Sequence, residues 1–174
     1  MSSLRAAIEH PWTAARLVKS KLLRPLIDPP ENRINILEED WDNLITLDAC
    51  RFDSFEEHNT LTGSLERIYS TASHTAEFVD QNITRSFSDT VYISASPQLA
   101  GTEDRFYHLE HLWEDHWDDE LNTVPPWAVT EQAREISESN PDKRLIVHYM
   151  QPHYPFIGEK GREIGKHATF TVNV

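Results

Sequence analysis

The chain of 174 residues contains a single cysteine, Cys50. One thiol excludes an internal disulfide framework and predicts a protein of a reducing compartment. No apolar run approaches the roughly 18 residues that a membrane-spanning helix requires. Residues 1–28 also lack the continuous apolar stretch of a signal peptide. We therefore expect a cytoplasmic protein.

Basic residues are scarce as well: 16 Lys and Arg stand against 29 Asp and Glu, a formal net charge of −13. Lysine is the scarcer of the two, with 5 against 11 arginines. This charge excludes a general binder of nucleic-acid backbones, which needs a basic surface. Two interpretations of the acid excess stay open. The chain is an acidic, halophilic protein kept soluble in concentrated salt by hydrated carboxylates, or it is an ordinary acidic cytoplasmic protein.

The chain does contain enough apolar sequence for one ordinary domain, because 39% of its residues are hydrophobic. Residues 1–30 differ from the rest, since five basic residues there outweigh Glu9 and Asp28, a net charge of +3. Apolar residues recur in this segment at roughly helical spacing, although Pro11 interrupts or starts a helix. A basic amphipathic segment of this kind predicts either peripheral membrane contact through residues 1–26 or packing on its own domain. We expect residues 31–174 to form that domain.

Strand and helix patterns alternate along the domain. Pro125 and Pro126 open the strongest helical pattern, and Asn140 and Pro141 end it. Such alternation predicts an α/β fold with a mostly parallel sheet flanked by helices. The expected strands are residues 43–48, 67–70, 90–94 and 144–150, and the expected helices are residues 51–58, 75–83 and 127–139.

Polar side chains follow two of the expected strands. Asp48 closes the first strand, and His153 follows the last one in a loop flanked by Pro152 and Pro155. Open α/β sheets bind ligands at the carboxyl ends of their strands. A carboxylate there holds a hard cation, and a charged histidine binds phosphate or sulfate oxygens. The structural alternatives are a turn cap for Asp48 and a backbone hydrogen bond for His153. His148, inside the strand, is expected to be a hydrogen-bonded core histidine.

Three short segments carry a further pattern. They are Trp-Asp-Asn-Leu-Ile-Thr-Leu-Asp-Ala-Cys-Arg-Phe-Asp (41–53), Tyr-Ser-Thr-Ala-Ser-His-Thr-Ala-Glu-Phe (69–78) and His-Tyr-Met-Gln-Pro-His-Tyr-Pro-Phe (148–156). In this order they resemble motifs of the sulfatase-like branch of the alkaline phosphatase superfamily. The resemblance implies that Asp48 is a metal ligand and that Thr75, at a helix start, is the nucleophile. It also implies that His153 contacts the anionic group of the substrate.

The resemblance covers only the N-terminal half of such a domain. Nothing after Gly158 matches the Asp-His element that supplies further metal ligands in the family, so the resemblance implies an alkaline-phosphatase-like fold truncated at the C-terminus. The Cys-x-Pro-x-Arg signature of true sulfatases is absent around Cys50, which favours a core role for this thiol and the threonine as nucleophile. The structural alternative for Thr75 is an ordinary helix N-cap.

Another group of candidate ligands lies in residues 108–119. His108 and His111 are three residues apart and would share one face of a helix, as some zinc ligands do. Leu109 and Leu112 recur at the same spacing, so an amphipathic helix with a solvated polar face is the favoured interpretation.

These expectations combine into a metal-dependent, sulfatase-like hydrolase or transferase that acts on phosphate or sulfate esters through Thr75. Its cofactor would be a divalent cation (Mn, Zn, Ca or Mg), and its substrate a small-molecule ester or one linked to a glycan or lipid. The alternative is a non-catalytic, truncated or degenerate relative that serves as a binding or scaffold protein. No nucleic-acid partner is expected.

Overall fold

The structure is a computed structural model, and it describes residues 33–164. The elements below belong to the compact unit that starts at Ile34. The predicted amphipathic segment 1–30, with its membrane contact through residues 1–26, lies outside the described residues. Within residues 33–164, no helix combines the length and the apolar character needed to cross a bilayer.

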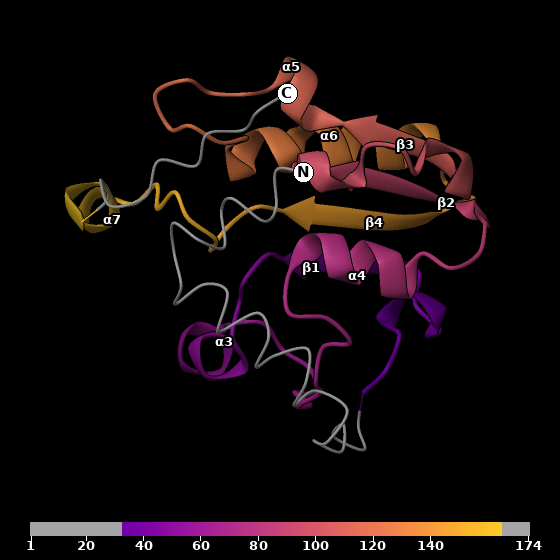
Figure 1. Cartoon of the computed structure of the whole chain (residues 1–174), viewed down its shortest axis with the longest axis horizontal. Coiled ribbons are helices and arrows are strands. Elements are labelled where there is room, and N and C mark those ends of the chain that lie inside the picture. The colour runs from indigo at the N-terminus through magenta and orange to yellow at the C-terminus, as the bar shows by residue number, and fades with distance from the viewer. Residues whose placement is uncertain (1–32, 165–174) are drawn as a thin grey trace, which may run out of the picture. The chain divides into compact units, whose positions relative to one another are not determined.

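Four parallel strands form one sheet in the order β1-β4-β2-β3 (Figure 1). They are β1 (Asn43–Leu47), β2 (Phe87–Ser94), β3 (Phe106–His111) and β4 (Arg144–Tyr149). This confirms the predicted α/β fold with a parallel sheet. Because the strands run in one direction, the carboxyl ends of the neighbours β1 and β4 meet at the same edge.

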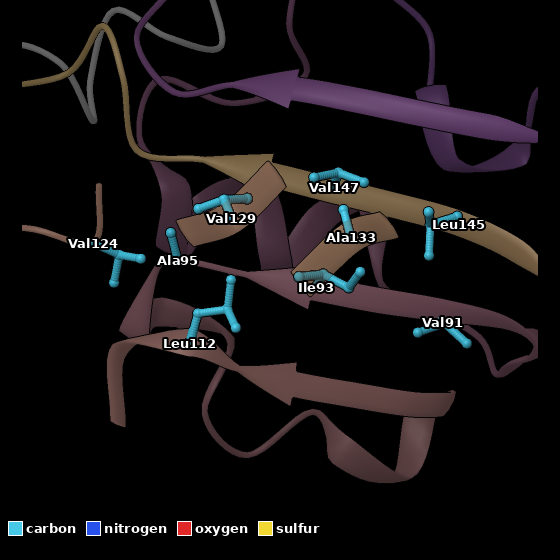
Figure 2. Close-up of a cluster of buried hydrophobic side chains, with 9 residues drawn as sticks. All are labelled: Val91, Ile93, Ala95, Leu112, Val124, Val129, Ala133, Leu145 and Val147. Carbon is cyan, nitrogen blue, oxygen red and sulfur yellow. The ribbon is translucent and has the colours of Figure 1, made fainter. Parts of the chain in front are cut away.

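Helix α6 (Pro126–Ser139) covers one face of the sheet with its apolar stripe. Val129 and Ala133 of the helix lie over Ile93 and Val147 of the strands, as Figure 2 shows. Alternate strand residues point to this face. Each fully buried Val, Ile or Leu side chain there stabilises the folded state by about 1.5–3 kcal/mol. The proline at its first turn starts α6 one residue before the predicted Trp127, and the predicted end at Ser139 is confirmed.

The opposite face of the sheet is covered by the short 3-10 helix η2 (Ile36–Glu38) and by α4 (Thr75–Asn82). Tyr92 and Ile146, which alternate with the residues of the first face, are buried here with Leu37. Phe78 and Val79 on one side of α4 pack against the same cluster. The helix predicted at residues 75–83 is therefore confirmed to within one residue. The remaining elements are α3 (Phe52–His58), η3 (Pro97–Leu99), η4 (Glu103–Arg105), α5 (Leu112–Asp115) and α7 (Glu159–Ile164).

Two of the strand predictions need correction. The strand predicted at residues 90–94 begins earlier, at Phe87, whose ring is buried and stacks on Phe106 at 5.7 Å. The strand predicted at residues 67–70 is wrong, since no strand forms there. The segment makes only an isolated bridge at Tyr69, and because all four residues are exposed, no burial of Ile68 or Tyr69 extends that bridge into a strand.

The amphipathic helix predicted around residues 108–117 is also wrong. Residues 106–111 form strand β3 instead, paired with β2, and only Leu112–Asp115 is helical. Leu109 and Leu112 are both buried, and their separation of three residues matches the spacing of a helix. They nevertheless belong to different elements, Leu109 to β3 and Leu112 to α5. Leu109 packs with Tyr92 on one face of the sheet, and Leu112 packs with Ile93 on the other.

Candidate functional site

A pocket of about 530 Å³ lies at the carboxyl edge of the sheet. Asp48 lines it from the end of β1, Thr75 from the first position of α4, and His153 from the loop after β4. These are the three site residues predicted from the sequence, and the structure brings them to one hollow. Their chemical roles stay predictions.

Asp48 is held at the strand end by the backbone. Its N–H donates to the carbonyl of Tyr149 in β4 at 3.0 Å, which extends the β1–β4 pairing by one residue. The chain then turns at once: Ala49 adopts the left-handed conformation with φ 58°, and the N–H of Cys50 donates to the carbonyl of Leu47 at 3.2 Å. A backbone hydrogen bond thus closes the turn, and the Asp48 carboxylate, 17% exposed, is directed to the pocket.

Thr75 contacts Asp48 directly. Its hydroxyl donates a hydrogen bond to Oδ2 of Asp48 at 3.1 Å. The alternative in which Thr75 caps the helix is wrong, because the N-cap is His74, whose Nδ1 accepts the N–H of Glu77 at 3.2 Å. Because His74 caps the helix, the Thr75 hydroxyl is not used as a cap and instead hydrogen-bonds the Asp48 carboxylate.

His148 lies deeper in the same pocket. It is buried, as predicted, and its Nδ1 lies 3.1 Å from the buried hydroxyl of Tyr92. Its other ring nitrogen, Nε2, lies 4.0 Å from Oδ2 of Asp48. Burial lowers the pKa of His148, and the nearby Asp48 charge opposes that shift. Burial, followed by the same charge, raises the pKa of Tyr92, so at neutral pH the phenol keeps its proton.

Sequence reasoning did not place His148 or Tyr92 in the site. Both residues line the pocket, yet they reside in strand interiors 56 residues apart. The sequence signal for them was a polar side chain at an alternate position of an otherwise apolar strand. The structure shows that both side chains lie on the face of the sheet that α4 covers.

His153 lies in the loop that follows β4 and is partly buried. Its N–H donates to the carbonyl of Met150 at 2.9 Å, and its ring Nδ1 donates to the carbonyl of Tyr154. The predicted backbone hydrogen bond is therefore present, and the ring still lines the pocket. The side chain of Gln151 attaches this loop to the core by donating to the carbonyl of Val124 at 3.2 Å.

The sequence offered two further candidates, Cys50 and the pair of His108 and His111, and only Cys50 lines the pocket. Cys50 lines the pocket but is a free, partly buried thiol whose hydrogen bond is to the carbonyl of Arg51 at 3.8 Å. His108 and His111 do not act together, because each pairs with a carboxylate of its own. His108 Nε2 lies 2.8 Å from Glu110, and His111 Nε2 lies 3.1 Å from Glu103.

The donor atoms of the pocket suit a divalent cation in chemical type. Asp48 Oδ2 and Thr75 Oγ1 are two oxygens 3.1 Å apart, the ligand type that Mg²⁺ and Mn²⁺ take when a substrate phosphate completes their coordination. Within residues 33–164, no group of three or more His, Cys, Asp and Glu side chains is arranged around a common metal position. The described part of the chain thus provides an open set of donors rather than a closed cage.

Comparisons of the chain with protein-family models, with curated proteins and with solved structures found no match.

Proposed function

We propose that this protein is a metal-dependent hydrolase or transferase of phosphate or sulfate esters, with Thr75 as its nucleophile. The observation that carries the proposal is the 3.1 Å hydrogen bond from the Thr75 hydroxyl to Asp48 Oδ2, at a pocket that His153 also lines. The order of the three motifs, which resembles that of sulfatase-like enzymes, supports the same assignment.

The chain's own residues suggest the chemical steps. Thr75 Oγ1 attacks the phosphorus or sulfur atom, and its proton has Asp48 Oδ2 as an adjacent acceptor. The bond to the leaving alkoxide breaks as the bond to Thr75 forms, and the alkoxide takes up a proton from solvent. Water or an acceptor alcohol then attacks the same atom and gives its proton to solvent. The bond to Thr75 breaks, and Thr75 Oγ1 recovers its proton from Asp48. A divalent cation, when bound at Asp48, lowers the pKa of the hydroxyl and neutralises charge on the ester oxygens.

The pocket supplies further support for anion binding. Thr75 is the first residue of an eight-residue helix, and the backbone N–H groups at a helix start favour an oxyanion. His153 would add positive charge opposite the transferred group when it is protonated. The pocket volume of about 530 Å³ is in the range that small-molecule ligands occupy, about 300–1,000 Å³.

The test compares Thr75→Ala and Asp48→Asn with the parent chain, using an aryl phosphate and an aryl sulfate in the presence of Mn²⁺, Zn²⁺, Mg²⁺ or Ca²⁺. Thr84→Ala and Asp80→Asn are matched controls, because both residues are exposed and neither lines the pocket. We expect the two site variants to lose turnover and the two controls to keep it. Undiminished turnover in both site variants would refute the proposal.

A second candidate function is a non-catalytic binding or scaffold protein that keeps the sheet. It is favoured by one observation: the described residues contain no three-ligand metal group. Calorimetric titration with divalent cations separates the two candidates. The scaffold function would be excluded if the parent chain binds a divalent cation and turns over an ester, and if Asp48→Asn abolishes both the binding heat and the turnover.

A further inference from the structure

The buried pair of His148 and Tyr92 has no part in the steps described above, although both residues line the pocket. His148 lies on β4 between two neighbouring strands, with Thr46 of β1 and Ser94 of β2 as its register partners. Its side chain is therefore fixed by the centre of the sheet rather than by a loop. Only 5% of the residue is exposed.

The two ring nitrogens of His148 have different surroundings. Nδ1 has the Tyr92 hydroxyl at 3.1 Å, whereas Nε2 has Asp48 Oδ2 at 4.0 Å. A separation of 4.0 Å is too long for a hydrogen bond, so a proton on Nε2 would have no bond to the carboxylate. A proton on Nδ1 would instead be shared with Tyr92. That tautomer leaves the lone pair of Nε2 on the side of Asp48.

In that tautomer, Nε2 of His148 and Oδ2 of Asp48, which lie 4.0 Å apart, would be two Lewis bases with space for a cation between them. Metal bonds to histidine and carboxylate ligands measure about 2.0–2.4 Å each, so one ion spans ligand atoms up to about 4.0–4.8 Å apart. Metal-binding histidines also characteristically donate their second ring N–H to a polar neighbour, which fixes the tautomer. Tyr92 is placed to be that neighbour.

We propose that His148, through Nε2, is a second protein ligand of the cation that Asp48 binds, with Tyr92 fixing its tautomer. The ion is then an imidazole-binding transition metal of the Zn²⁺ class, because Mg²⁺ and Ca²⁺ prefer oxygen ligands. This assignment rests on the proposed function, which places a cation at Asp48. It narrows the cofactor to one chemical class.

Cobalt(II), a spectroscopic substitute for Zn²⁺, tests the assignment without any activity measurement. A histidine bound through Nε2 keeps an exchangeable proton on Nδ1, and bound Co²⁺ shifts the proton resonance of that group far outside the ordinary spectral range. We expect one such resonance in the full-length chain, coupled to ¹⁵N in histidine-labelled protein and lost in D₂O. It should be absent in His148→Gln and present in His58→Gln, which changes an exposed histidine of α3.

Zn²⁺ and Mg²⁺ calorimetry completes the test. His148→Gln should weaken Zn²⁺ binding by at least about tenfold and leave Mg²⁺ binding unchanged. Tyr92→Phe keeps the ring and its packing, so it should retain the shifted resonance but exchange its proton faster. If Zn²⁺ binding requires Asp48 but is the same in His148→Gln, or if no shifted histidine resonance forms, this inference is wrong while the proposed function stands. If the parent chain binds no divalent cation, both are wrong.

Discussion

Thr75 Oγ1 and Asp48 Oδ2 are joined by a 3.1 Å hydrogen bond, although 27 residues separate them along the chain. The two residues come from different layers of the fold, one from the end of a strand and one from the start of a helix. Apolar packing of Phe78 and Val79 against the sheet holds that helix in place. The geometry of the candidate nucleophile therefore depends on core packing one turn further along α4.

Replacing Thr75 by valine and by serine separates shape from chemistry. Valine keeps the branched shape but has no hydroxyl, so we expect ester turnover to fall by about 10³-fold or more. Serine keeps the hydroxyl and should retain measurable turnover. Steady-state kinetics with the aryl ester that the parent chain cleaves provides the measurement.

Stability measurements supply the control for this pair. The valine variant loses one partly buried hydrogen bond to a carboxylate, which should cost about 1.5–3 kcal/mol of the free energy of unfolding. Urea unfolding of both variants should therefore show folded proteins at the assay temperature. Parental turnover in Thr75→Val would exclude Thr75 as the nucleophile.

Tyr92→Phe tests the buried hydrogen bond to His148. The substitution removes the hydroxyl 3.1 Å from Nδ1 and leaves a polar ring atom in the core without this partner. We expect the free energy of unfolding to fall by about 1–3 kcal/mol, measured by urea denaturation. Tyr107→Phe is the matched control, since Tyr107 is 54% exposed, and it should change stability by less than about 0.5 kcal/mol. Equal stability of the two variants would contradict the buried hydrogen bond.

The elements that carry the site could be predicted because their signals are local. The apolar run before Asp48 and the apolar run that contains His148 are both short and end in turn residues. Helix α6 begins at the second residue of a proline pair, Pro126, and ends at Ser139 with Asn140 as its C-cap, and both signals act within one turn of the helix. Parallel strands then place their carboxyl ends together, so a common position for Asp48 and His153 follows from topology.

Other features depend on neighbours that local sequence does not specify. The apolar residues of β1 predict a strand buried on both faces, yet β1 pairs only with β4 in the described sheet, and Ile45 is 63% exposed. The strand order places β4 between β1 and β2, which no pattern of single strands encodes. The contact between Tyr92 and His148 depends on that order and on the register of β2 with β4.

The exposed ion pair of Arg51 and Asp53 makes a separate prediction near the site. Arg51 Nη2 lies 2.6 Å from Asp53 Oδ2, and Nε lies 2.9 Å from Oδ1. The hydrogen bond from Arg51 lowers the pKa of Asp53 from 3.8 to about 2. Carboxyl ¹³C NMR titration should show this low midpoint, and Arg51→Gln should return it toward 3.8. A midpoint that does not move in the variant would show that the pair does not form in solution.

The pH dependence of stability should reveal the buried His148 in metal-free protein. Burial lowers its pKa, so below a pH of about 6.5 the unfolded chain binds a proton at this position that the folded chain does not. The His148 contribution to the free energy of unfolding is therefore fully present above the unfolded pKa and is lost as the pH falls toward the folded one. Glutamine has no such proton. Urea unfolding of the parent chain and of His148→Gln, in chelator from pH 8 to pH 5, should give profiles that run parallel above pH 7 and converge below it. Profiles that stay parallel throughout would mean that His148 takes up its proton equally in the folded and unfolded chains, and hence that the imidazole is not buried as described.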